Sequence, residues 1–169
     1  ILSYQSENNE GLAIAPANDG AVVITGINEA HAERMGSMEN ITATIFEAVE
    51  FSNPDALVVL NGDDENVVAN YKKYCNERKT ILFSAGNNEK ADVRAQNKTF
   101  DVQKLVWDFD IDSTRYDLPL LGEYAAGTCA GVVAVAKTLE FSSLDIQVGL
   151  SRVEPVEHRL QPILSAGNV

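Results

Sequence analysis

Apolar and polar positions occur in blocks over the first half of the chain. Three short, largely apolar runs occupy residues 21–25 (AVVIT), 56–60 (ALVVL) and 79–85 (KTILFSA). Between them, residues 38–51 and 65–77 carry apolar side chains at the three- and four-residue spacing of amphipathic helices. The first helical run begins after Ser37, and the second has Val67, Val68, Tyr71 and Cys75 on one face. Strands with continuous apolar runs are typical of parallel sheets, because such sheets are buried on both faces. The first half therefore predicts an α/β fold, with a parallel sheet flanked by helices.

The second half has a different pattern. Within residues 91–121, Leu105, Trp107, Phe109 and Ile111 alternate with Val106 and acidic residues, which predicts an antiparallel β segment. Residues 123–140 are rich in Ala and Val and long enough for a buried helix. Residues 142–150 begin with Ser and Asp, which favour helix starts, so they predict one more short helix.

Composition and charge limit the function classes. The chain has 169 residues and a formal net charge of −12, which disfavours binding to nucleic acid or to anionic membranes. No apolar stretch reaches the roughly 18 residues that span a bilayer, and the start of the chain does not resemble a signal peptide. Cys75 and Cys129 lie far apart without CxxC spacing, so we expect buried, reduced thiols in a cytoplasmic protein.

Local motifs leave the chemistry open. We find no GxxxxGK[ST] phosphate loop, HExxH, GxSxG or CxxC string. His31 lies in an acidic loop with Glu29 and Glu33, where it is either a metal ligand or one polar residue of a connection. The adjacent Asp63 and Asp64 allow the same two interpretations, and the simpler one is a solvated turn with a helix cap.

The order of several strings is more informative than any one of them. VVITGINEAHAERMGSMENI is followed by ALVVLNGDDENV, then by ADVRAQN, and then by LPLLG with AGVVAVAKTLEFSSLDIQVGLSRVEPVEHRLQPI. Over about residues 12–163 this order resembles the Mur ligase family. The ADVRA string and the overall spacing resemble the member that adds D-alanyl-D-alanine to a UDP-muramoyl peptide. The resemblance implies that residues 1–154 are part of the central ATPase-type domain and that residues 155–169 begin the C-terminal domain.

Membership of this family implies an ATP-dependent reaction. ATP phosphorylates a carboxylate of the substrate, an amine attacks the acyl phosphate, and an amide forms while magnesium ions neutralise phosphate charge. By resemblance, His31 is a magnesium ligand and Arg159 is a nucleotide contact, a role that suits a guanidinium group. The implied cofactors are ATP and magnesium, and the implied partners are a nucleotide and a UDP-muramoyl peptide.

The chain departs from the family pattern inside its own length. The active-site Lys of the family falls on Ile45, and the family's H-N-x-x-N string falls on Tyr124, Ala125 and Thr128. The string of the phosphate loop is also absent, so we expect this chain not to catalyse ligation alone. An upstream strand of the family's sheet is missing as well, which predicts an exposed sheet edge covered by the N-terminal half of a ligase or by another subunit.

Three functional hypotheses follow. The first is a portion, or a degenerate relative, of the ATP-dependent ligase that adds D-alanyl-D-alanine in peptidoglycan precursor synthesis. The second is a catalytically inactive Mur-like binding or structural module, which the residues at positions 45 and 125 favour. The third is another ligase of the superfamily, such as a relative of folylpolyglutamate synthase, and the ADVRA string argues against it.

Overall fold

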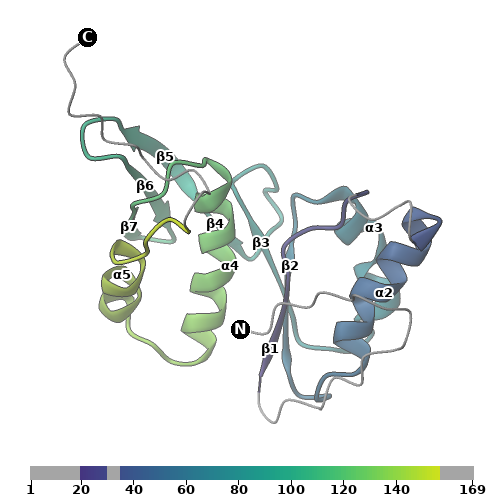
Figure 1. Cartoon of the computed structure of the whole chain (residues 1–169). Helices are drawn as coiled ribbons and strands as arrows, with labels where there is room; N and C mark the ends of the chain where they lie inside the picture. Colours follow the sequence, from purple (N-terminus) through teal and green to yellow (C-terminus); the bar gives the residue numbers. More distant parts are fainter. Residues whose placement is uncertain (1–19, 30–34, 157–169) are drawn as a thin grey trace.

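The first half of the chain forms a parallel β-sheet, as its apolar runs predict. The computed structural model describes residues 20–29 and 35–156 (Figure 1). Strands β1 (Ala21–Ile24), β2 (Leu57–Asn61), β3 (Thr80–Ser84) and β4 (Val93–Arg94) lie side by side in this order and all run parallel. We call this sheet A.

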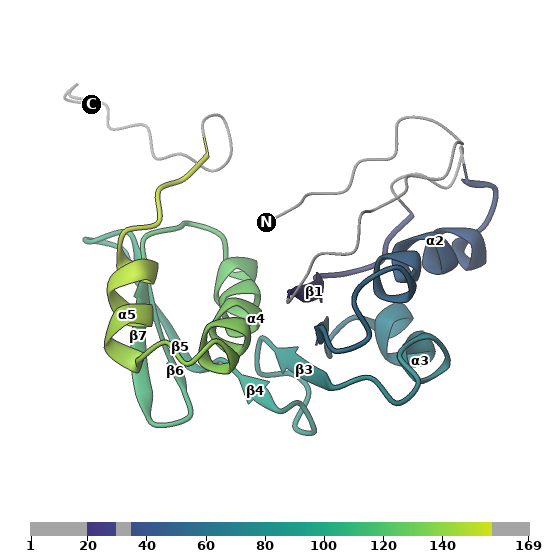
Figure 2. The same ribbon diagram turned by 90° about the horizontal axis from the view of Figure 1, so that it is seen from below.

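Helices cover both faces of sheet A. Helices α2 (Met38–Glu50) and α3 (Glu65–Tyr74) cover one face, and α4 (Tyr124–Thr138) packs on β2 and β3 from the other (Figure 2). The side chains of β2 alternate between the two cores: Val58 and Leu60 face α2 and α3, while Val59 faces α4. All three are fully buried, which explains why the strand shows no polar alternation.

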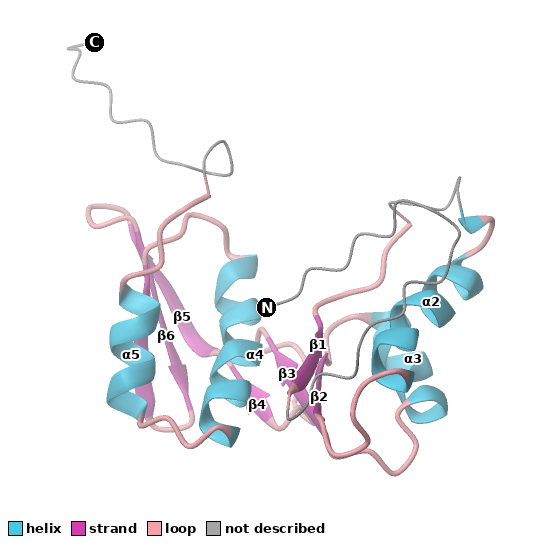
Figure 3. Cartoon of the chain, turned by 60° about the horizontal axis from the view of Figure 1, so that its bottom comes forward, coloured by secondary structure: helices cyan, strands magenta, loops and turns pink. Residues whose placement is uncertain are grey.

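The second half adds a three-stranded antiparallel sheet, which we call sheet B. Strands β5 (Gln96–Asp101), β6 (Val106–Ile111) and β7 (Thr114–Leu118) pair in sequence order. Helices α4 and α5 (Ser143–Ser151) pack against it, so α4 lies between the two sheets (Figure 3). Phe109 and Ile111 face this core, whereas Asp108 and Asp110 face outward, as the alternation predicts.

Side-chain caps determine where three helices begin. The backbone N–H of Asn40 donates to Ser37 Oγ at the start of α2, over 3.2 Å. Asp64 caps α3 and Ser142 caps α5 in the same way. These polar residues satisfy N–H groups that have no partner inside the helix, so the predicted helix starts are confirmed.

Three details differ from the sequence prediction. Val93 and Arg94 were expected in the antiparallel segment, but they pair parallel with β3 and close sheet A. Val68 was expected on the apolar face of its helix, but its side chain is 40% exposed. Leu105 lies in the turn between β5 and β6 with a φ of 56°, a conformation that no apolar alternation predicts.

The structure also bears on the expected sheet edge, the two cysteines and membrane-spanning segments. Among the described strands, β1 lies at one end of sheet A, and its Val23 side chain is 44% exposed. Cys75 and Cys129 are both free and buried, as expected. None of the helices within residues 20–29 and 35–156 is long and apolar enough to cross a bilayer.

Candidate functional site

The carboxyl ends of the parallel strands meet at one edge of sheet A. Residues 25–28 follow β1, residues 61–64 follow β2, and residues 84–88 end β3 and begin the next loop. In open parallel sheets, ligands bind in the crevice outside the carboxyl ends of the strands. We call these three segments the carboxyl edge and take it as the candidate site.

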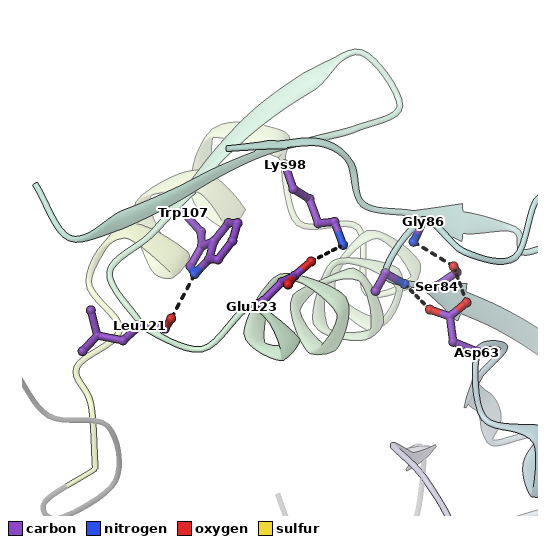
Figure 4. Close-up of polar contacts among 8 residues, drawn as sticks. Asp63, Ser84, Gly86, Lys98, Trp107, Leu121 and Glu123 are labelled. Carbon is purple, nitrogen blue, oxygen red and sulfur yellow. Dashed lines mark hydrogen bonds and ion pairs between the residues drawn. The ribbon is translucent and has the colours of Figure 1, made fainter. Parts of the chain in front are cut away.

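Asp63 organises the loop that follows β3. Its Oδ1 accepts the hydroxyl proton of Ser84 over 2.7 Å, and its Oδ2 accepts the backbone N–H of Ala85 over 2.6 Å (Figure 4). The hydroxyl oxygen of Ser84 in turn accepts the backbone N–H groups of Gly86 and Asn88, over 2.8 and 3.1 Å. Ser84 is fully buried, so one carboxylate and one hydroxyl hold the whole turn in place.

Asp64 and Asn66 hold the loop that follows β1. Asp64 Oδ1 caps α3 by accepting the N–H of Val67 over 2.9 Å, and its Oδ2 accepts the N–H of Ile27 over 3.0 Å. The amide of Asn66 donates to the carbonyl of Ile27 over 2.9 Å, and the amide of Asn61 donates to that of Thr25 over 2.8 Å. Side chains at the end of β2 and the start of α3 therefore hold residues 25–28 in place.

These contacts correct one interpretation of the two aspartates and confirm another. Asp64 is a helix cap, as the simpler interpretation expected. The turn is not merely solvated, however, because all four carboxylate oxygens of Asp63 and Asp64 accept hydrogen bonds. Within the described residues, no three or more His, Cys, Asp and Glu side chains are grouped to hold a metal ion.

The two residues proposed from the resemblance are not placed. His31 and Arg159 lie outside the described residues, so their metal and nucleotide roles stay predictions. The position of the family's Lys is described: Ile45 on α2 is partly buried and packs against the core beneath α2 and α3. Glu47, two positions further along the helix, is exposed.

The first turn of α4 borders the carboxyl edge. A Cβ atom added to Gly127 would lie 2.8 Å from the Cβ of Ala85, so the helix nearly touches the end of β3. The ammonium group of Lys98 pairs with Glu123 at the start of the helix over 3.3 Å, and the indole N–H of Trp107 donates to the carbonyl of Leu121 (Figure 4). These contacts join sheet B to the beginning of α4.

The three positions of the H-N-x-x-N string have different surroundings. Tyr124 is 68% exposed, whereas Ala125 is buried in the core between the sheets. The Thr128 hydroxyl donates to the carbonyl of Tyr124 over 3.3 Å, inside its own helix. None of the three positions carries the amide side chain that the asparagines of the family string have.

Sequence reasoning missed the pairing of Asp63 with Ser84 and of Asn66 with Ile27. These partners are separated by 21 and 39 positions, and only the parallel arrangement of the strands brings them together. The usable signal was the run of Asn and Asp directly after β2, since polar residues at the carboxyl end of a buried strand lie at the ligand-binding edge.

Curated relatives match almost the whole chain but extend well beyond it. The UDP-N-acetylmuramate–L-alanine ligase of Agrobacterium fabrum is 27% identical over 167 residues, which is 94% of this chain and 35% of the relative. The enzyme of the same name from Brucella anthropi is also 27% identical, with the same coverage. The chain thus spans about a third of the length of these relatives.

Solved structures share the fold. MurF from Acinetobacter baumannii superposes with a TM-score of 0.74 at 22% identity, over 85% of this chain and 31% of that chain. MurF from Thermotoga maritima, solved in complex with ADP, gives a TM-score of 0.69 at 21% identity, over 90% of this chain and 34% of that chain. The family model for the Mur ligase middle domain matches residues 7–136. Because that match covers most of the chain and the parallel sheet agrees with it, this chain belongs to the Mur ligase family.

Proposed function

We propose that this chain is a portion of an ATP-dependent ligase that forms an amide bond on a UDP-muramoyl substrate. The observation that carries the proposal is the family match over residues 7–136, which includes all of the carboxyl edge. The hydrogen bonds of Asp63 and Asp64 support it, because they hold three loops in a fixed arrangement where a nucleotide would bind.

The amine substrate has two candidates. The ADVRA string and the overall spacing favour D-alanyl-D-alanine, and MurF structures share the fold. The curated relatives are named for L-alanine, which they add to UDP-N-acetylmuramate. A relative of folylpolyglutamate synthase is a separate hypothesis for the whole reaction. A serine-to-alanine mutant of L. casei FPGS shares the fold, with a TM-score of 0.65 at 16% identity, but the ADVRA string argues against this hypothesis. We retain D-alanyl-D-alanine as the proposal and L-alanine as its direct competitor.

The proposed cofactors are ATP and magnesium. Nucleotide binding is supported by the ADP complex of a protein with the same fold. His31 would bind the metal and Arg159 the nucleotide. The described residues of the carboxyl edge do not form a ready ligand set for magnesium, because no three or more of their His, Cys, Asp and Glu side chains are grouped, so we assign them no step with the ion. A domain boundary near residue 155 belongs to the same proposal.

The first experiment is calorimetric titration of the chain with Mg-ATP and Mg-ADP, repeated on His31→Ala and Arg159→Ala. We expect saturable binding that both substitutions weaken. Val132→Ala, an exposed site on the outer surface of α4, is the matched control and should bind like the parent. Absence of binding by a chain that circular dichroism shows to be folded would refute the nucleotide site.

A second candidate function is a catalytically inactive Mur-like module. Ile45 favours it, because this apolar side chain packs into the core where the family places a charged ligand. The two candidates differ in one assay. Phosphate release that depends on both a UDP-muramoyl acceptor and an alanine-type amine, with the N-terminal part of a ligase supplied, supports the enzyme. Nucleotide binding without release under these conditions supports the module.

A further inference from the structure

Strand β7 has an open edge, on the side of the molecule opposite α2 and α3 (Figure 1). Within residues 20–29 and 35–156 it pairs with β6, and no described strand lies on its other side. The side-chain amide of Gln147 on α5 donates to the backbone carbonyl of Arg115 over 2.7 Å, so this carbonyl points away from β6. Backbone groups alternate in direction along a strand, and those of Asp117 therefore point the same way. Because a carbonyl oxygen accepts two hydrogen bonds, both residues can still pair with a further strand.

The side chains of this edge carry opposite charges in a self-complementary order. Arg115 and Asp117 are exposed on the outer face of sheet B, on either side of Tyr116, whose buried side chain faces the core. A second copy of β7, antiparallel and centred on Tyr116, would place Arg115 of each copy opposite Asp117 of the other. The neighbouring registers with the same backbone directions are centred on Arg115 or on Asp117 and place like charges opposite each other. Charge therefore selects one register, and the strand that matches this edge is the edge itself.

Both charges are weakly paired in the described single chain. Asp117 lies opposite Asp108 in the register of β6 and β7, and the ion pairs of the described residues do not include it. The guanidinium of Arg115 lies over the outer face of sheet B, where it pairs with Asp110 over 3.2 Å and donates to Thr99 over 3.0 Å. This side chain is 45% exposed, and exposed ion pairs contribute little, so it can turn toward a second copy at small cost. A guanidinium opposite Asp117 would offset the repulsion between Asp108 and Asp117.

Helix α5 adds apolar surface beside the same edge. Leu144 is 67% exposed and Val148 is 39% exposed, and Ser151 follows at helical spacing, so the three share one face of the helix. Val148 and Ser151 also line a groove of about 360 Å³ together with Arg115 and Asp117 of β7. When two β7 strands pair about a two-fold axis, the α5 helices of both copies lie on the same face of the joined sheet. Burial of Leu144 and Val148 between them adds a hydrophobic contribution to the backbone hydrogen bonds.

We propose that the open edge of β7 and this face of α5 form the surface through which two copies of the chain associate. The β7 strands pair antiparallel about Tyr116, so that the two copies of sheet B join into one sheet. The net charge of −12 on each copy opposes association, but at about 0.15 M salt charges more than about 8 Å apart are largely screened. The contact is small, so we expect a weak dimer that separates into single chains at the low concentrations of an unfolding experiment. This inference does not depend on nucleotide binding.

The test is analytical ultracentrifugation of the full chain from low micromolar to near-millimolar concentration, over which the parent should dimerise. Arg115→Asp and Asp117→Arg each place like charges opposite one another, so each variant alone should associate at least about tenfold more weakly. An equimolar mixture of the two variants restores opposite charges at both positions and should associate within about threefold of the parent. Lys72→Asp makes the same charge change as Arg115→Asp at an exposed site on α3 and should have no effect.

A cysteine cross-link tests the register independently. Hydrogen-bonded antiparallel pairs have Cα atoms about 5.5 Å apart, within the range of a disulfide, so a mixture of Arg115→Cys and Asp117→Cys should cross-link under mild oxidation. Arg115→Cys alone should not, because the two copies of that position lie roughly 8 Å apart. A parent that stays monomeric at every concentration refutes the proposal. So does association that both charge variants leave unchanged, a mixture of folded charge variants that does not associate, or cross-linking of Arg115→Cys alone as fast as the mixture.

Discussion

Two helical glycines should respond in opposite directions to the same substitution. Gly127 lies in the first turn of α4, and a Cβ atom there would be 2.8 Å from the Cβ and 3.4 Å from the Cα of Ala85. Gly149 lies in α5, and a Cβ atom there would have no heavy atom within 4 Å. We expect Gly127→Ala to destabilise the protein and Gly149→Ala to stabilise it.

The magnitude follows from two opposing contributions. In a helix interior, alanine is more favourable than glycine by about 1 kcal/mol, because glycine loses more backbone entropy. At Gly127 this gain is opposed by overpacking, since carbon atoms prefer separations of about 3.5–4.0 Å and such overpacking costs about 1–3 kcal/mol. Gly127→Ala should therefore lose about 1 kcal/mol of unfolding free energy, and Gly149→Ala should gain about 0.5–1 kcal/mol.

Urea denaturation followed by circular dichroism measures both changes. The difference between the two variants isolates the steric contribution, because the helix propensity is common to both. Ala85→Gly combined with Gly127→Ala removes the opposing methyl group and should recover at least about 0.5 kcal/mol beyond additivity. Equal stabilisation by Gly127→Ala and Gly149→Ala would show that α4 does not approach the end of β3 as closely as the structure has it.

Three further predictions concern single polar groups. Partial desolvation of its carboxyl group and the facing Asp108 carboxyl raise the pKa of the exposed Asp117 above 3.8, so its stabilising contribution is present at low pH and is lost as the pH rises through the raised pKa. Asp117→Asn should therefore gain about 0.2–1 kcal/mol over the parent at pH 7 but not at pH 3 in urea unfolding, and an equal effect at both pH values would contradict this reasoning. Asp63→Ala removes the acceptor of two hydrogen bonds and should cost about 1.5–3 kcal/mol by the same assay, with a smaller loss in Asp63→Asn; a neutral Asp63→Ala would mean that the turn at Ser84 is held by other contacts. Burial raises the pKa of the Cys129 thiol to about 12, so this thiol should react with a maleimide at pH 8 only after urea is added, and rapid labelling of the native chain at Cys129 would refute its burial.

The sequence predicted the elements that depend on local pattern. Continuous apolar runs identified β1, β2 and β3 within one residue at each end, because the strands of a parallel sheet with helices on both faces are mostly apolar. Ser37 and Ser142 marked the starts of α2 and α5, because a cap acts within one turn of its helix. The string order also identified the family, which the family match confirms.

Only the tertiary structure decided how distant segments meet. Val93 and Arg94 are too short a run to reveal a partner, and it is their position beside β3 that makes them the fourth parallel strand. Asp63 resembles any polar turn residue until β3 brings Ser84 to it. Caps and apolar runs follow from interactions over a few residues. The site depends on contacts between residues some twenty or more positions apart, and chain folding alone determines which of those form.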